Sequence, residues 1–306
     1  GVINIITKKG DGDSEENTWR VGARVQEESM GKEYDFFKDK GLHNESIDLG
    51  FNHKSGLFVN GGYTRNNHGG WQGDLTGREK RWHPKDQALM NGMFGFQNRN
   101  MNVWYRLDFL DEKIFGPNNG SELQPEKVSD KDFLTKRYTH QLQSDWKLDN
   151  RLDVHAALSY QDYKRRTRTT ESDLSTGEKW LSSAEASQDI TQYKAWIARA
   201  TVAWNIAPEF SVQPGVEYQW TQGEGGRIDG TPKVSDLAFF LSAEYKPWEW
   251  LSLRPGVRTF IVADYDAPIA IPSVLTKFKL TKHMDLRLSY AYGFRSPTLQ
   301  ELYFSF

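Results

Sequence analysis

Apolar and polar residues alternate one by one along most of the chain, which is the period of a β-strand. In the stretch 284–292, Leu286 and Leu288 fall on one face of such a strand, and Asp285 and Arg287 fall on the other. The same alternation recurs along the sequence, and many of the segments are ten residues or longer. It predicts thirteen strands, at about Thr18–Glu28, His43–His53, Leu57–Asn66, Ala88–Asn98, Met101–Asp111, Leu134–Leu148, Arg151–Tyr163, Asp189–Ile206, Glu209–Gln222, Ser235–Pro247, Leu251–Val262, Ile269–Leu280 and Met284–Gly293.

The connections between these strands alternate between long and short. The long, polar ones are Ser29–Leu42, Asn67–Gln87, Glu112–Phe133, Lys164–Gln188, Gly223–Val234 and Ala263–Pro268. The short ones are Lys54–Gly56, Arg99–Asn100, Asp149–Asn150, Ala207–Pro208, Trp248–Trp250 and Thr281–His283. Antiparallel hairpins with long loops on one rim and tight turns on the other are typical of an up-and-down barrel of the outer-membrane type. Tryptophans near the short turns fit an interfacial girdle, namely Trp19, Trp146, Trp204, Trp248 and Trp250.

The position of the arginines predicts which face of this barrel points outward. An arginine that faces lipid at the bilayer midplane costs about 2–4 kcal/mol, so Arg254, Arg258 and Arg287 are expected to face the lumen. The lipid face then carries Leu286, Leu288, Leu253, Val257, Leu237, Phe239, Leu241, Ala243, Tyr245, Leu152, Val154, Ala156, Leu158 and Tyr160. A half-buried strand of a soluble protein shows the same alternation, but usually over only five or six residues.

Composition narrows the class of protein. The 306 residues carry a net charge of −2, which gives no reason to expect a nucleic-acid partner, and they contain no cysteine for disulfides or thiolate metal sites. The mean hydropathy of −0.72 is compatible with a membrane barrel, whose apolar residues occupy only every second position. Motifs of serine hydrolases, P-loop nucleotide-binding proteins and zinc peptidases are missing, so no enzymatic activity is expected.

Both ends of the chain resemble one family. The opening Gly1-Val-Ile-Asn-Ile-Ile-Thr-Lys-Lys9 is similar to the last plug strand of TonB-dependent outer-membrane receptors. The closing Gly293-Phe-Arg-Ser-Pro-Thr-Leu-Gln-Glu-Leu-Tyr303 resembles the Phe-Arg-Ala-Pro box and the Leu-x-Glu-Leu that follows it in many of these receptors, with serine where alanine is commoner. The residues of this motif are Phe294, Arg295, Ser296, Pro297, Leu299, Glu301, Leu302 and Tyr303.

The resemblance implies an all-β, antiparallel up-and-down transmembrane barrel in the outer membrane of a Gram-negative bacterium. Residues 1–17 would be the end of the plug domain and its linker, and residues 18–306 would be the N-terminal part of a barrel of about twenty-two strands. The TonB complex is the expected partner, through plug parts that this chain lacks, and outer-membrane lipid and lipopolysaccharide are the expected surroundings.

The function implied by the resemblance is active uptake of a bulky, scarce nutrient, foremost an iron chelate such as a siderophore or haem. A cobalamin receptor of the same family is the alternative, and no resident cofactor is expected. Two other classes remain open from the residues alone: a passive porin-like channel, which would conduct small solutes constitutively, and a soluble adhesin or carbohydrate-binding protein, which would need no detergent.

Candidate ligand contacts lie in the long loops. In the second of these loops, a histidine (His68 or His83) can ligate haem iron, and a tryptophan (Trp71 or Trp82) can stack on a flat ligand. The structural alternative is a solvated histidine beside tryptophans that pack on the loop itself.

Charged residues add three further candidates. The basic run that contains Arg165, Arg166 and Arg168 can attract an anionic chelate, or it can contact lipopolysaccharide phosphates and solvent. A calcium site can include oxygen ligands from Asp264, Asp266 and the neighbouring Tyr265, although Ca²⁺ requires six to eight oxygen ligands. Arg295 is predicted at the mouth of the barrel as a ligand contact, with the structural role of a loop anchor as the alternative.

Overall fold

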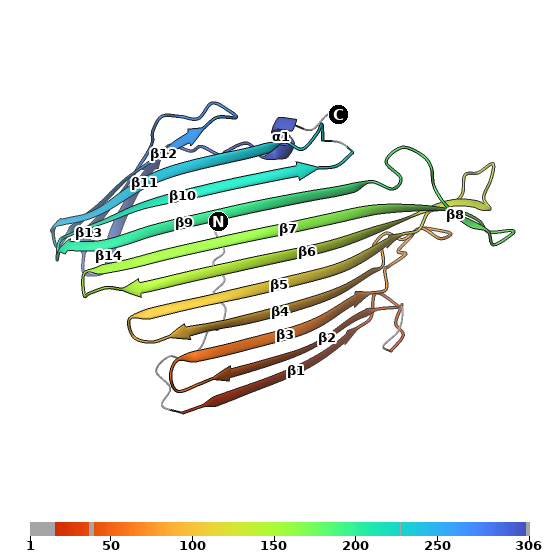
Figure 1. Ribbon diagram of the computed structural model, residues 1–306, viewed down its shortest axis with the longest axis horizontal. Helices are drawn as coiled ribbons and strands as arrows, with labels where there is room; N and C mark the ends of the chain where they lie inside the picture. The colour runs from red at the N-terminus through yellow and green to blue at the C-terminus, as the bar shows by residue number, and fades with distance from the viewer. Residues whose placement is uncertain (1–15, 37–39, 227, 304–306) are drawn as a thin grey trace.

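The computed structural model describes residues 16–36, 40–226 and 228–303, which form one large antiparallel sheet (Figure 1). Its fourteen strands follow one another in chain order, except that the short β8 lies off the main path and pairs only with β7. Their bounds are β1 Thr18–Glu28, β2 Leu42–Asn52, β3 Leu57–His68, β4 Lys85–Gln97, β5 Met101–Gly116, β6 Lys127–Lys147, β7 Leu152–Asp173, β8 Lys179–Leu181, β9 Ile190–Ala207, β10 Phe210–Glu224, β11 Lys233–Trp248, β12 Leu251–Val262, β13 Ile271–Thr281 and β14 Met284–Ala291. The helix α1, Leu299–Tyr303, follows the last strand.

All thirteen predicted strands are confirmed, and so is the antiparallel up-and-down order. The largest difference lies in β6 and β7, which reach 21 and 22 residues and continue well beyond their expected ends. Segments expected to belong to the long loops before β6 and after β7 therefore pair as strand. Neither β8 nor α1 is expected from the alternation.

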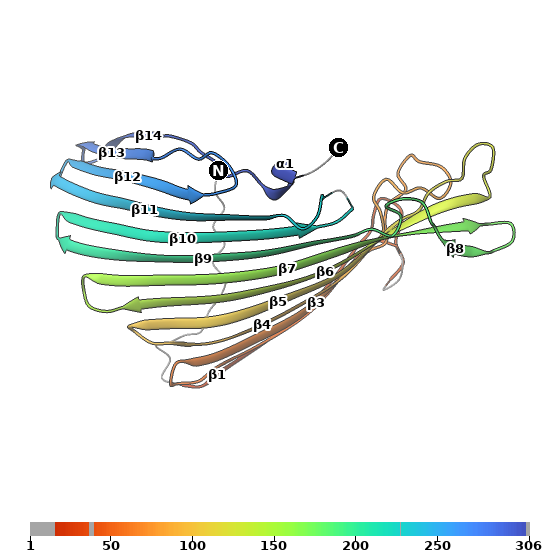
Figure 2. The ribbon, with the colours of Figure 1, turned by 45° about the horizontal axis from the view of Figure 1, so that its top comes forward.

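Long loops and short turns are segregated to opposite ends of the sheet. All the tight turns lie at the left of Figure 1, whereas β8 and the long loops that follow β1, β3, β5 and β7 lie at the right. We refer to these as the turn end and the loop end. The sheet also curls, so that β12, β13 and β14 turn out of the plane of the central strands (Figure 2). In the described sheet β1 and β14 are the two edges, so it is an open section of the predicted barrel.

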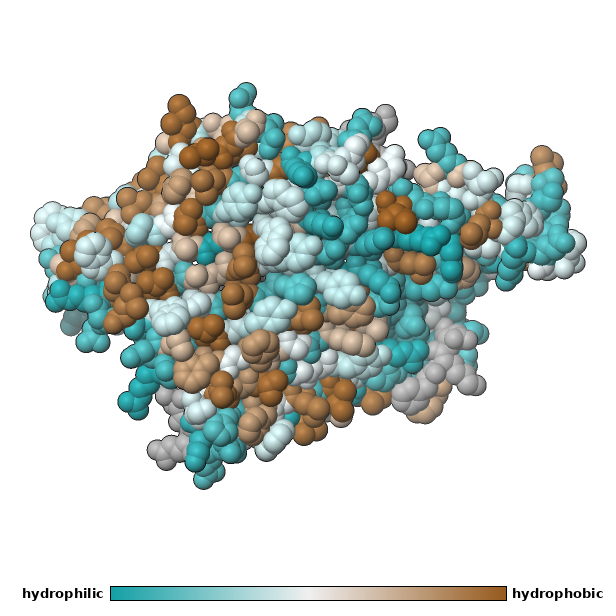
Figure 3. Space-filling model, viewed as in Figure 1, coloured by the Kyte–Doolittle hydropathy of each residue, from teal (hydrophilic) through white to brown (hydrophobic). Residues whose placement is uncertain are grey.

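The two faces of the sheet separate as predicted. The pairing register places Arg258 opposite Phe240, and it places Arg287 opposite Lys277, which pairs with Ser252 on the same face as Arg254. We call this the inner face. The other face, the outer face, carries paired apolar residues such as Leu241 and Val257. Brown, hydrophobic side chains gather over the body of the sheet in Figure 3, whereas the right-hand end is mostly teal.

The few deeply buried residues are distributed in small clusters. On the inner face, near the turn end, Phe58, Met93 and Trp104 pack together. A second cluster of Ile228, Val234 and Leu299 lies at the loop end. In the part of the chain that the structure describes, no helix is long and apolar enough to span a membrane.

The predicted tryptophan girdle is found near the turn end. All five tryptophans are exposed, from 42% for Trp146 to 77% for Trp19. Trp19 packs on Phe51 of the next strand at 4.4 Å between ring centroids, and Trp248 stacks on Trp250 at 5.2 Å. Exposed indoles that cover one another suit an interface between an apolar and an aqueous phase.

Candidate functional site

A cavity of about 670 Å³ lies at the loop end of the inner face of β6, β7 and β9. We call it the loop-end cavity. Its lining residues are Lys131, Phe133, Tyr163, Arg165, Thr167, Thr169, Glu185, Ala186, Ser187, Asp189, Thr191, Tyr193, Gly225, Ile228 and Gln300. Its volume falls within the range of sites that hold small molecules.

The extended strands β6 and β7 build the floor of this cavity. Because successive side chains alternate between faces, Phe133, Tyr163 and Arg165 all point to the inner side at neighbouring positions of the paired strands. The Arg165 guanidinium lies 4.5 Å from the centre of the Phe133 ring, which is a cation–π geometry. Tyr163 faces Tyr193 of β9, with 6.3 Å between the ring centroids. The floor thus combines a fixed cation with three aromatic rings.

Acidic groups at the rim balance part of this positive charge. Glu185 and Asp189 come from the loop that precedes β9, and Lys131 adds a second cation on β6. The Asp189 carboxylate accepts a hydrogen bond from the Gly226 amide at 3.0 Å, which ties the loop after β10 to the loop before β9. The Asp189 carboxylate therefore stabilises the wall of the cavity through this hydrogen bond.

The family-like motif after β14 forms another part of the wall. Gln300 of α1 donates a hydrogen bond to the Tyr193 hydroxyl at 3.2 Å. Leu299, only 5% exposed, inserts beside Ile228 and Val234. The closing segment of the chain is therefore packed against loops that begin about seventy residues earlier.

A capping box holds α1 in this position. The Glu301 carboxylate accepts hydrogen bonds from the Thr298 amide at 2.8 Å and from its hydroxyl at 3.0 Å, and the Glu301 amide donates back to Thr298 Oγ1 at 3.3 Å. Arg295 donates to both oxygens of the same carboxylate, at 2.9 and 2.6 Å. The hydrogen bonds from Arg295 and Thr298 lower the pKa of Glu301 to about 2.

The aromatic residues around the motif fix the loop further. Phe294 packs edge-on against Phe260 at 5.4 Å and lies 6.3 Å from Tyr265. Burial, aided by the neighbouring Asp236 carboxylate, raises the pKa of Tyr265 to about 12. Arg295 is predicted as a ligand contact at the mouth of the barrel, with a loop anchor as the structural alternative. Its two hydrogen bonds to the Glu301 carboxylate are the geometry of a loop anchor.

The basic run is split between the two faces of β7. Arg165 lines the loop-end cavity, whereas the alternation turns Arg166 and Arg168 to the outer face. There, Arg168 forms an ion pair with Asp132, and Arg166 is exposed. The predicted ligand contact is thus supported by position for Arg165 alone.

The histidine and tryptophan candidates come together in the loop between β3 and β4. Trp71 and Trp82 exchange backbone hydrogen bonds at 2.9 and 3.0 Å, and their rings meet edge to face at 5.4 Å. His68 lies 6.1 Å from Trp82, and its Nδ1 accepts a hydrogen bond from the Gly70 amide. His83 packs against Gly116 at the end of β5. These contacts match the structural alternative, in which the tryptophans pack on their own loop.

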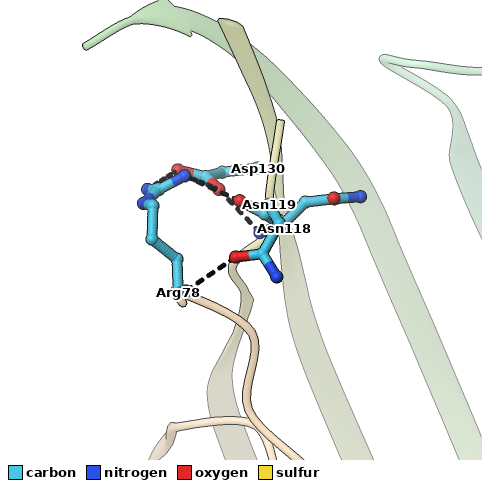
Figure 4. Close-up of polar contacts among 4 residues, drawn as sticks. All are labelled: Arg78, Asn118, Asn119 and Asp130. Carbon is cyan, nitrogen blue, oxygen red and sulfur yellow. Dashed lines mark hydrogen bonds and ion pairs between the residues drawn. The ribbon is translucent and has the colours of Figure 1, made fainter. Parts of the chain in front are cut away.

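This loop is also clamped to the next one. Arg78 forms two hydrogen bonds with the Asp130 carboxylate, at 3.0 and 2.6 Å, and the Asn118 amide donates to the same carboxylate at 3.0 Å (Figure 4). The Arg78 amide donates to the Asn119 side chain at 2.7 Å. We call this set the loop clamp. It joins the loop after β3 to the loop after β5.

The candidate calcium ligands show no such convergence. The Asp264 carboxylate accepts a hydrogen bond from the Ser235 amide at 3.2 Å, and its neighbour Tyr265 packs against the cluster of Ile228, Val234 and Leu299. Within the described ranges, no three His, Cys, Asp or Glu side chains gather closely enough to hold a metal ion. A calcium site at Asp264 and Asp266 stays a prediction.

Comparison with known proteins agrees with this architecture. Residues 215–306 match the family model "TonB dependent receptor-like, beta-barrel". The ferric enterobactin receptor PfeA of Pseudomonas aeruginosa, in complex with enterobactin, superposes with a TM-score of 0.61 at 12% identity over 97% of this chain and 46% of its own. The ferric-catecholate import receptor Fiu of E. coli K12 gives a TM-score of 0.52 at 9% identity over 88% of this chain and 54% of its own.

No curated protein matches the sequence, and the chain spans less than half of the length of PfeA. The open sheet with segregated loops and turns defines the wall of an outer-membrane-type β-barrel. The recognition predicted from the sequence is confirmed: residues 215–306 match the family model of the TonB-dependent receptor β-barrel, and the whole described sheet has the fold of such a barrel. The matched family model describes receptor barrels, which agrees with the expectation that the chain is not an enzyme. The predicted plug segment, residues 1–17, lies almost wholly outside the described residues.

Proposed function

We propose that the chain is part of a TonB-dependent receptor in the outer membrane of a Gram-negative bacterium, and that the receptor takes up a bulky iron chelate. The observation that carries this proposal is the loop-end cavity on the inner face of the sheet. It opens where a ligand from outside the cell would arrive, and no resident cofactor is part of the proposal.

The lining of the cavity favours a chelate with flat, anionic groups. The Arg165 guanidinium is held in place over Phe133, so it offers donors to a carboxylate or phenolate without first losing side-chain freedom. Tyr163 and Tyr193 provide ring faces and hydroxyls beside it. These features suit a siderophore with aromatic groups, and they are the reason we place siderophores ahead of haem and cobalamin.

Support for haem is weaker because of the contacts of the histidines. Nδ1 of His68 already accepts a hydrogen bond from the Gly70 amide, and the adjacent tryptophans pack on each other.

Energy transfer in the proposal requires the TonB complex, which would act on plug residues outside the described part of the chain. Capture of the ligand by the loops would then be followed by movement of the plug.

The test uses the full-length receptor in a strain from which its gene has been deleted. Growth is measured with ferric siderophores, haem or cobalamin as the limiting nutrient, and siderophores are expected to rescue. Loss of one charged hydrogen bond is worth about 1.5–3 kcal/mol, so Arg165→Ala should weaken ligand binding by about 10- to 150-fold. Arg166→Ala, on the opposite face of the same strand, is the matched control and should bind normally.

Three results would contradict the proposal. Rescue by none of the nutrients would remove iron-chelate uptake. Steady ion conductance through the purified receptor, without saturable ligand binding, would favour the porin-like alternative. Equal losses in the Arg165→Ala and Arg166→Ala variants would show that the loop-end cavity does not hold the ligand.

A further inference from the structure

The loop-end cavity has a second end, for which the proposed function gives no role. Side chains on one face of a strand recur at every second residue, so Thr169 points to the same side of β7 as Arg165, and both line the cavity. Four residues of strand separate them, a distance of about 13 Å. We call the region lined by Lys131, Thr169, Glu185 and Ser187 the polar end of the cavity.

The Thr169 side chain at the polar end is buried, and its hydroxyl is unpaired. The residue is only 3% exposed. Its backbone amide donates to the Ser187 carbonyl at 2.9 Å, and its carbonyl accepts from the Ser182 amide at 3.0 Å. The Thr169 hydroxyl, in contrast, has no hydrogen-bond partner among the described residues. A buried hydroxyl without a partner costs free energy, so a polar group that pairs with it from the cavity gains affinity.

A strained turn, residues 184–187, forms the wall beside Thr169. The Ser187 amide donates to the Ala184 carbonyl at 3.1 Å, which closes the turn. Ala186, at the third position of this turn, has a φ of 60°, a conformation that usually requires glycine. Residues 185–187 all line the cavity. Strained backbone of this kind is common at sites that bind ligands.

The groups around Thr169 favour a ligand group that both donates and accepts hydrogen bonds. Lys131 lies directly opposite Thr169 in the register of β6 and β7, and it offers an ammonium group. Glu185 offers a carboxylate, and both charged side chains are exposed. Alcohol hydroxyls can accept from the ammonium, donate to the carboxylate and pair with Thr169. An apolar group would leave the Thr169 hydroxyl unpaired, and Glu185 would repel a second anion.

We propose that the polar end binds a hydroxyl-bearing arm of the iron chelate, and that Thr169 selects for this arm. The anionic head of the chelate would lie at Arg165, and the hydroxyls would lie about 13 Å away along β7. This inference rests on the proposed function and deepens it, because it names the class of chelate. The receptor would prefer a chelate with alcohol groups at this distance to one of the same length and charge without them.

The experiment measures the binding of two synthetic ferric tris(catecholate) chelates to the purified full-length receptor by isothermal titration calorimetry. One chelate carries an arm of about 13 Å that ends in two hydroxyl groups, and the other carries a hydrocarbon arm of the same length. The unaltered receptor should bind the hydroxylated chelate about tenfold more tightly. Thr169→Val replaces the hydroxyl with a methyl group of similar size and should remove this preference, whereas Thr169→Ser should keep it.

Two further variants locate the effect. Thr170→Val changes the next residue of β7, whose side chain points to the outer face, and it should leave both affinities unchanged. Arg165→Ala should weaken the binding of both chelates by the same factor, because it acts on the head that they share. Normal binding of the hydrocarbon chelate by Thr169→Val would show that this variant is folded.

Equal affinities of the unaltered receptor for the two chelates would overturn the inference. An equal loss of both affinities in Thr169→Val would also overturn it, because the hydroxyl would then have only a structural role. In both cases, saturable binding that Arg165→Ala weakens would leave the proposed function standing. If neither chelate bound to the unaltered receptor, the proposed function would fail and this inference would fail with it.

Discussion

Replacing Asp130 with alanine is expected to open the loop clamp. The Asp130 side chain is only 13% exposed and accepts three hydrogen bonds, two from Arg78 and one from the Asn118 amide. Hydrogen bonds to charged groups contribute about 1.5–3 kcal/mol each, but the Arg78 side chain is 34% exposed, which reduces the total through screening. We therefore expect the free energy of local opening of the loop after β3 to fall by about 2–3 kcal/mol.

Hydrogen exchange followed by mass spectrometry measures this opening directly, in peptides that cover residues 69–84. A fall of 2 kcal/mol corresponds to exchange about 30-fold faster. The control is Asp74→Ala in the same loop, which removes an ion pair with Arg81 of 2.6 Å whose side chains are 76% and 55% exposed. Exposed pairs contribute at most about 1 kcal/mol, so exchange should rise no more than about fivefold.

Equal effects of Asp130→Ala and Asp74→Ala would refute this reasoning, because they would mean that burial does not set the strength of the two contacts. Unchanged exchange in Asp130→Ala would refute it more simply. A double-mutant cycle with Arg78→Ala separates the ion pair from the bond to Asn118, since only the former is lost in both single variants.

Three other predictions concern the two faces of the sheet and the helix α1. Leu241→Arg should destabilise the folded receptor in lipid bilayers by about 2–4 kcal/mol in denaturant titrations, whereas Ser242→Arg, on the inner face, should cost little. Leu299→Ala should raise hydrogen exchange in residues 298–303 by at least about 30-fold, because removal of a buried leucine costs about 2–5 kcal/mol. The Glu301 pKa of about 2 lies below its ordinary value, so the anchor should be intact above about pH 4.5 and should loosen as the pH falls towards 2. A spin label on a cysteine introduced at Gln300 reports this loosening, and Glu301→Gln should abolish its pH dependence between pH 4.5 and 2.

The strands could be predicted from the sequence because a strand in a barrel obeys one local rule. Side chains alternate, and the short turns mark the ends of the hairpins, so β1 and β12 begin and end where expected. The rule fails at the loop end of β6 and β7, where both faces are polar and no longer alternate in hydrophobicity. Pairing there depends on contacts between the strands, such as that of Asp132 with Arg168.

The loop-end cavity could not be predicted from the sequence, for a related reason. Its floor joins Phe133 and Arg165, which are 32 positions apart, and its wall includes Gln300. No short motif contains these residues together. Arg165 could be predicted as a candidate because it lies in a basic run, but the run alone does not show that its neighbours point to the other face. The pairing register of β7 is needed to show which arginines share a face with Arg165. Alternation of side chains gives the same answer once the strand is continued past Tyr163.

The length of β7 bears on how the receptor would meet its surroundings. Its 22 residues span roughly 70 Å, and at the usual tilt of about 45° they rise roughly 50 Å along the barrel axis. The apolar band of such a barrel is only about 25 Å tall, so half of the hairpin of β6 and β7 would stand clear of the bilayer. Its tip, with Leu174 and Trp180 half exposed, would then be the first part of this wall that an antibody or a bacteriophage encounters. The hairpin of β6 and β7 would then combine the proposed binding cavity with a surface epitope that can be recognised from outside the cell.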